Sequence, residues 1–184
     1  MADIVTDFTK SAQQIIIDLV NNDNTLALVP ASVTFGVPTA ATVGGSIVRD
    51  TDLTLTAVEG SGYTGSATIH YNRVDLSVVP GTRSTTFPKG DATHVSDLLP
   101  EINAAYGINM SNTADAQHPD FVEAALPTFT GTPNEEHTFQ FTADANSLVW
   151  ENSVTLTVHA DDIPLSTAIT NATLNGLTYV QPAG

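Results

Sequence analysis

The sequence predicts an α+β fold, with a mostly antiparallel β-sheet or sandwich and two short amphipathic helices. Two stretches, residues 52–76 and 137–159, alternate apolar and polar side chains with the period of two that is typical of strands. Two others, residues 7–21 and 96–106, place their apolar side chains along one helical face. Each helical stretch precedes one of the strand stretches, so the order helix, connection, hairpin occurs twice.

Residues 7–21 are expected to form the first helix, because their apolar side chains recur with helical spacing. Asp7 is the predicted N-cap, and the polar run NNDNT ends the helix. Pro30 and Pro38 interrupt the segment that follows, which therefore predicts short extended pieces and turns. The apolar stripe of the helix consists of Phe8, Ala12, Ile15, Ile16 and Leu19.

Residues 52–76 predict a β-hairpin with a glycine-rich loop. Leu53, Leu55 and Ala57 share one face of its first strand, between polar threonines. The glycines of the loop EGSGYTGS also fit G-x-G-x-x-G, the spacing of dinucleotide-binding sites. That motif requires a helix directly after the glycines, because the helix N-terminus holds the pyrophosphate. The segment SATIHYNRVDL alternates as a strand instead, so a hairpin loop is the favoured interpretation.

The second half of the chain has the same layout. A helix is expected from about Ser96 to Tyr106, with Pro100 in its first turn and Gly107 as its terminator. Another pair of alternating strands follows from residue 137. On these strands Phe139, Phe141 and Ala143 share one face, and Val154, Leu156 and Val158 share another.

We therefore predict a single domain over residues 1–184 that contains an internal duplication. Its two halves are residues 7–78 and 93–162, each a helix plus a hairpin, and a C-terminal strand is expected within residues 163–184. The two halves are offset by roughly 85 residues, and their identity is low, so the duplication is a structural hypothesis.

Charge narrows the classes of partner. The chain has 20 acidic and 5 basic residues and a net charge of -15, which disfavours nucleic acids and anionic membranes. It has no cysteine, and hence no disulfide framework or thiolate chemistry. The N-terminal segment MADIVTDFTK lacks the apolar region of a signal peptide, and no run is long enough to span a bilayer. We expect a protein that is made in a cytoplasm and remains soluble.

The histidines raise the question of a metal site, because three of the five lie beside carboxylates in the segments HPD (118–120), EEH (135–137) and HADD (159–162). None has the spacing of a zinc motif or an EF-hand, so a polar sheet face is the favoured interpretation, with Ca²⁺ at the acidic loops as the alternative. Adjacent Glu135 and Glu136 would point to opposite faces of a strand, and no G-x-S-x-G elbow occurs. We predict no cofactor and no enzymatic activity.

The first half of the chain resembles a family of uncharacterised virion proteins of tailed bacteriophages. Those proteins carry one or more copies of a unit with a short helix, a phrase like VTFGVPTAA, and a hairpin like DTDLTLTAVEGSGYTGSATIHYNRVDL. The strand 51–57, the turn 60–65 and the segment YNRVDL (71–76) carry the match. The second half matches only in layout, since residues 145–152 lack the glycines and HADD replaces YNRVDL. The resemblance implies a structural particle protein without catalytic residues.

The predicted function is that of a non-enzymatic virion structural protein, made in the cytoplasm of a bacterial host. Its partners would be other virion proteins, in a homo-oligomer or a large assembly. Capsid decoration at the head surface is the first expectation, and a tail or baseplate component is the alternative. The predicted contact residues are Tyr63, Arg73, Asp75 and Trp150. A carbohydrate- or cell-surface-binding module is the alternative from another class, and it requires an exposed aromatic platform around Tyr63 and Trp150.

Overall fold

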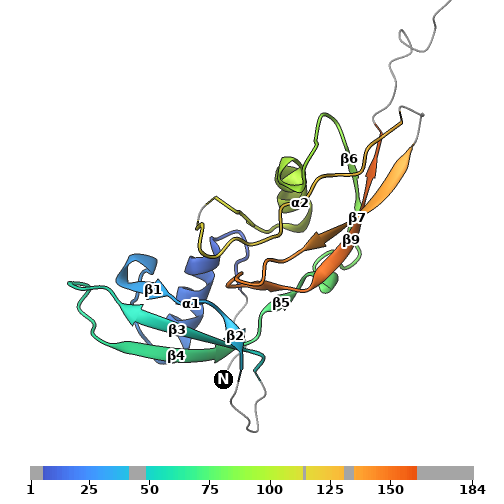
Figure 1. The fold of residues 1–184 in the computed structure, drawn as a ribbon. Helices are drawn as coiled ribbons and strands as arrows, with labels where there is room; N and C mark the ends of the chain where they lie inside the picture. The colour runs from blue at the N-terminus through green and yellow to red at the C-terminus, as the bar shows by residue number, and fades with distance from the viewer. Residues whose placement is uncertain (1–5, 42–48, 114, 131–134, 161–184) are drawn as a thin grey trace, which may run out of the picture.

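The computed structural model describes residues 6–41, 49–113, 115–130 and 135–160, and it confirms the α+β class with mostly antiparallel strands in several sheets. The strand predicted within residues 163–184 lies outside the described residues. No helix among the described residues is long and apolar enough to cross a bilayer. Figure 1 shows an elongated arrangement with α1, β3 and β4 at one end and α2, β7 and β9 toward the other.

The first hairpin forms the sheet at one end of the molecule, here called sheet 1. Its strands are β1 (Val33–Phe35), β2 (Thr39–Ala40), β3 (Thr51–Ala57) and β4 (Ser66–Tyr71). Strand β3 is central and pairs antiparallel with all three others, with β4 on one edge and the short β1 and β2 on the other. Leu53 and Leu55 are buried while Thr54 and Thr56 are exposed, as the alternation predicts.

Helix α1 (Ala12–Asn24) begins five residues later than predicted. Its N-cap is Ser11, whose side chain accepts a hydrogen bond from the N–H of Gln14, and not Asp7. The carboxylate of Asp7 instead accepts bonds from the backbone N–H and the hydroxyl of Thr9, which closes a local turn before the helix. Phe8 therefore precedes the helix. The buried face of α1 consists of Ile15, Ile16, Ile17 and Val20.

The second hairpin forms sheet 2, whose strands are β6 (Thr86–Pro88), β7 (Glu136–Thr142) and β9 (Ser153–His159). Strands β7 and β9 are antiparallel, and β6 joins the other edge of β9 in parallel. The register places Phe139 opposite Leu156 and Phe141 opposite Val154. The two apolar sets that were predicted separately thus lie on one common face, where they pack in the core.

Helix α2 (Leu99–Tyr106) follows a 3₁₀ turn, η3 (Val95–Leu98), so helical structure begins near Ser96 as predicted, but the α-helix itself begins three residues later. Pro100 lies in the first turn, where backbone N–H groups have no carbonyl partner within the helix, so a residue without an N–H is tolerated. Gly107 ends the helix with φ 67°, a left-handed conformation that costs glycine little.

Between the two ends lies a junction that was not predicted. Strand β5 (Val74–Asp75) pairs in parallel with β8 (Trp150–Glu151), and the 3₁₀ turn η2 (Leu76–Val78) follows β5. Figure 1 shows β5 on the path from the β3–β4 end to the β7–β9 end. The buried apolar residues form one cluster, which draws on both helices and both hairpins.

Both helices end in the same side-chain clasp. Near the end of α1, the amide of Asn21 donates to the carbonyl of Leu28 and accepts from its N–H, both at 2.8 Å. Near the end of α2, Asn103 makes the same two bonds to Met110, both at 3.1 Å. Each asparagine therefore fixes the backbone seven residues further on, where the chain leaves the helix.

The paired clasps are consistent with the predicted duplication, but the strand pairing differs between the halves. In sheet 1 the first hairpin strand, β3, is central, whereas in sheet 2 the second, β9, is central and has a parallel neighbour. The duplication therefore stays a prediction.

We expect Asn103→Ala to lower the free energy of unfolding by about 2 kcal/mol, because it leaves a buried N–H and carbonyl without partners. Met110 is buried, so water cannot readily replace the lost bonds. Urea unfolding measures the change. Asn22→Ala is the matched control: Asn22 is exposed, and among the described residues its side chain bonds only its neighbour Asp23. Equal losses in the two variants would contradict a structural role for the clasp.

Candidate interaction surfaces

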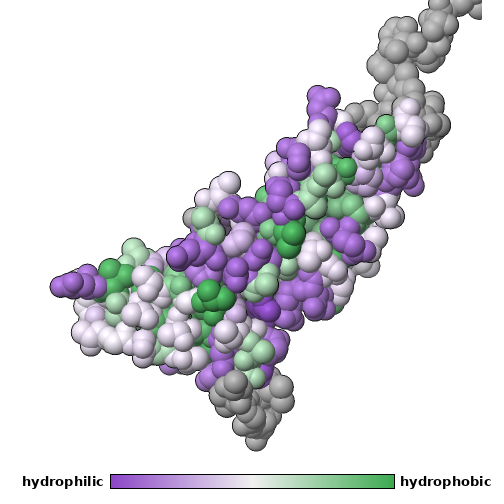
Figure 2. Space-filling model, in the orientation of Figure 1, coloured by the Kyte–Doolittle hydropathy of each residue, from purple (hydrophilic) through white to green (hydrophobic). Residues whose placement is uncertain are grey.

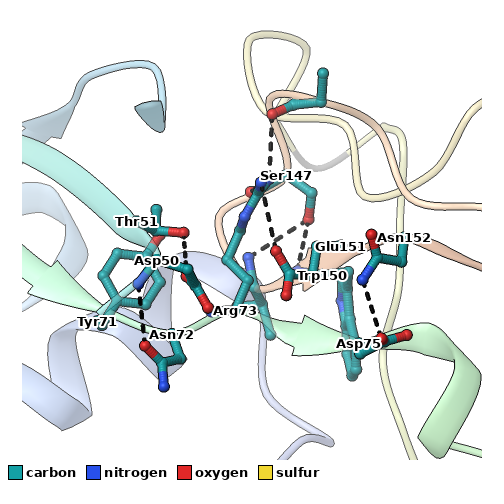
Figure 3. Close-up of polar contacts among 12 residues, drawn as sticks. Asp50, Thr51, Tyr71, Asn72, Arg73, Asp75, Ser147, Trp150, Glu151 and Asn152 are labelled. Carbon is teal, nitrogen blue, oxygen red and sulfur yellow. Dashed lines mark hydrogen bonds and ion pairs between the residues drawn. The ribbon is translucent and has the colours of Figure 1, made fainter. Parts of the chain in front are cut away.

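Three of the four predicted contact residues, Arg73, Asp75 and Trp150, come together at the junction of β5 and β8 (Figure 3). The register pairs Val74 with Trp150 and Asp75 with Glu151. These residues are 76 positions apart in the chain, so their proximity is a product of the fold. The fourth, Tyr63, lies in the loop of the first hairpin, between β3 and β4.

Arg73 attaches the end of the first hairpin to the loop before β8. Its Nη1 donates to the carbonyls of Ala145 at 3.2 Å and Ser147 at 3.4 Å, and its Nη2 lies 3.7 Å from the carboxylate of Glu151. The backbone N–H of Arg73 donates to Asp50. Among the described residues, its Nε is buried without a hydrogen-bond partner. The guanidinium therefore acts within the chain, and a contact with another protein stays a prediction.

Asp75 also has partners within the chain. Hydrogen bonds from Ser77 and from the amide of Asn152 hold the pKa of its carboxyl below the ordinary range. Its neighbour across the junction behaves oppositely: burial raises the pKa of Glu151, and Asp50 adds to the rise while Arg73 opposes it. The junction thus gathers several carboxylates around one guanidinium, as expected where acidic residues far outnumber basic ones.

Trp150 is a core residue. It is 2% exposed, and its ring lies 5.4 Å from that of Phe8, centroid to centroid. The hydroxyl of Tyr71 donates to the carbonyl of Leu148, two residues before Trp150, at 2.6 Å, and burial raises the pKa of this tyrosine. The carbohydrate-binding alternative requires an exposed aromatic platform that contains both Trp150 and Tyr63. Because Trp150 is buried, the two residues form no such platform.

Tyr63 lines an apolar groove, here called the Tyr63 groove, at the loop end of sheet 1. The groove has a volume of about 390 Å³ and lies between the end of α1, strands β1, β3 and β4, and the hairpin loop. None of the described residues that line the groove is charged. Leu26 and Tyr63 are 44% and 40% exposed, although both are large and apolar. Figure 2 shows few strongly hydrophilic side chains over this end of the molecule, apart from its tip.

A polar pocket of about 260 Å³ lies at the start of α1, and sequence reasoning missed it. The Nδ1 of His118 contacts the carboxylate of Asp115 at 2.7 Å, and its Nε2 contacts the carbonyl of Gly36 at 2.9 Å. Gln13 donates to the same carboxylate. Asp120 is buried in the wall of the pocket. The only sequence signal was the segment HPD, because Gln13 and Gly36 reach the pocket from elsewhere in the fold.

The other histidines bond partners of their own and do not join the polar pocket. His137 contacts Glu135 at 2.7 Å, while the Nδ1 of His159 faces the carbonyl of Ala160. His70 contacts Asp52, its direct neighbour across strands β3 and β4. Within the described ranges, no three histidine, aspartate or glutamate side chains converge as metal ligands would.

Comparison with known proteins relates the chain to a protein family. No curated protein matches the chain, and no solved structure does. The resemblance to virion proteins therefore stays a prediction. A family described as a family of unknown function (DUF7941) matches residues 6–184. Because that match covers nearly the whole sequence, the chain belongs to this family.

Proposed function

We propose that the chain is a non-enzymatic structural protein of a bacteriophage virion, made in the host cytoplasm and incorporated by binding other virion proteins. The Tyr63 groove carries the proposal. An uncharged apolar groove with large exposed side chains is unusual on a chain with net charge -15, and such surfaces mark protein contacts. Head-surface decoration is the first form of this role, and a tail or baseplate position is the second. Neither nucleic acid nor membrane is a proposed partner.

The polar pocket favours a structural role over catalysis. A general base needs a free ring nitrogen to take a proton from substrate. Both ring nitrogens of His118 already face acceptors, the carboxylate of Asp115 and the carbonyl of Gly36. Among the described residues, no serine or threonine hydroxyl is a hydrogen-bond partner of His118, so no nucleophile is paired with this histidine there.

The test is immunogold electron microscopy on purified particles of a phage that encodes the chain, with the recombinant protein as competitor. We expect label on the particle that the competitor removes. Label over the head supports decoration, and label on the tail or baseplate selects the second form of the role. Absence of label, with no peptide of the chain in mass spectra of the particles, would overturn the proposal.

A further inference from the structure

Next to the Tyr63 groove, sheet 1 has an open edge. Within the described part of the chain, β4 pairs only with β3, and its residues Ser66, Ala67 and Thr68 are exposed. Several β4 side chains also line the groove. An open edge beside an apolar groove is the arrangement that accepts an added strand: the backbone pairs with the edge, and alternate side chains enter the groove.

Charge restricts what can occupy this place. Two copies of a chain with net charge -15 repel each other, so an occupant from another copy must bring few charges. Residues 163–184, IPLSTAITNATLNGLTYVQPAG, contain no charged side chain, and neither does the groove lining. Leu174 and Leu177 lie in the part of this segment for which the sequence predicts a strand. Segment and groove are thus both neutral on an otherwise acidic protein.

The position of β9 favours another copy as the source of the segment. Strand β9 ends at His159 in sheet 2, and the groove lies at the loop end of sheet 1. Figure 1 places these two parts toward opposite ends of the molecule. A segment that leaves one end and a groove at the other end suit two different copies in a head-to-tail contact. Such contacts are heterologous and build rings or filaments.

We propose that residues 163–184 of one copy bind the Tyr63 groove and the free edge of β4 on the next copy. This self-association names one partner within the proposed structural role and rests on it.

Complementary variants of the full chain test the contact by sedimentation velocity. Leu26→Glu places a charge in the groove and leaves the C-terminal segment intact. The double variant Leu174→Glu with Leu177→Glu charges the segment and leaves the groove intact. We expect the wild type to associate with rising concentration and each variant alone to remain monomeric. An equimolar mixture should form one-to-one dimers, because each variant supplies the part that the other lacks.

Val78→Glu is the control. Val78 is 68% exposed and lies in η2, away from the groove, so this variant should associate as the wild type does. Unchanged circular dichroism of Leu26→Glu shows that the groove variant is folded. A wild type that stays monomeric, or a mixture that does not dimerise, overturns the proposal. If particles are labelled but the protein does not self-associate, only the proposed contact is overturned. If the protein self-associates but particles carry no label, only the proposed virion role is overturned.

Discussion

Replacing Trp150 with alanine is expected to lower the free energy of unfolding by about 4 kcal/mol, the range for a large aromatic side chain removed from a core. The indole is 2% exposed and packs against the ring of Phe8. It also belongs to β8, the strand that pairs with β5 at the junction between the two sheets. The cavity would therefore weaken the place where the two ends of the molecule meet. A loss of this size is a large fraction of the stability of an ordinary domain, about 5–15 kcal/mol.

Urea unfolding of Trp150→Ala beside Tyr63→Ala measures this effect. Tyr63 was predicted as a contact residue like Trp150, but its ring is 40% exposed, so its removal should cost within about 1 kcal/mol. Trp150→Phe keeps an aromatic ring and should therefore lose less stability than Trp150→Ala. If Trp150→Ala does not fold, the phenylalanine variant still gives a measurable value. Equal losses for Trp150→Ala and Tyr63→Ala would show that the junction does not depend on the indole.

The contrast between these two aromatic residues shows what local sequence can predict. Alternation of apolar and polar residues predicted β3, β4, β7 and β9, because the period of two is a local property of an extended backbone. Pro100 and Gly107 likewise marked the second helix through backbone geometry. Trp150 stands in a two-residue strand whose partner is 76 positions earlier, and no local pattern carries that pairing. Its place in this junction could not be predicted.

The helix start illustrates a second reason for failure. Asp7 and Ser11 are both good N-cap residues, and both precede apolar residues at helical spacing. The choice between them depends on which turn forms, and Thr9 gives Asp7 a local alternative. In the polar pocket the missing information is again non-local, because the bond from His118 to Gly36 joins residues 82 positions apart. The sequence therefore predicted elements well and the contacts between them poorly.

We expect the stability of the protein to carry a pH dependence from Asp120, opposite in sign to that of an ordinary paired carboxylate. Asp120 is 4% exposed, and burial raises its pKa from 3.8 to about 6, with a further rise from Asp115. The N–H of Ser111 and the hydroxyl of Ser147 donate to its two oxygens and oppose the rise. The folded chain thus holds this proton at a pH where the unfolded chain has lost it.

The sign follows from linkage. A raised folded-state pKa gives stability that is full below about pH 4 and is lost as the pH rises to about 6. A shift of about two pKa units corresponds to about 3 kcal/mol. Carboxyls whose pKa is lowered by hydrogen bonds, such as those of Asp75 and Asp97, contribute in the opposite direction at lower pH. The total curve is a sum, so the term from Asp120 must be isolated by substitution.

Asp120→Asn removes the titration and keeps a side chain of the same shape. Any cost of altering the contact with Ser147 does not depend on pH and shifts the whole curve of the variant. The difference in unfolding free energy between variant and wild type should therefore change by about 3 kcal/mol, in favour of the variant, between about pH 3 and pH 7. Urea unfolding at intervals of pH measures it, and Asp23→Asn, the same substitution at an exposed position near the end of α1, is the control. A difference that stays constant across this range would mean that Asp120 ionises as readily in the folded chain as in the unfolded one, and that burial in the wall of the polar pocket does not disfavour its charge.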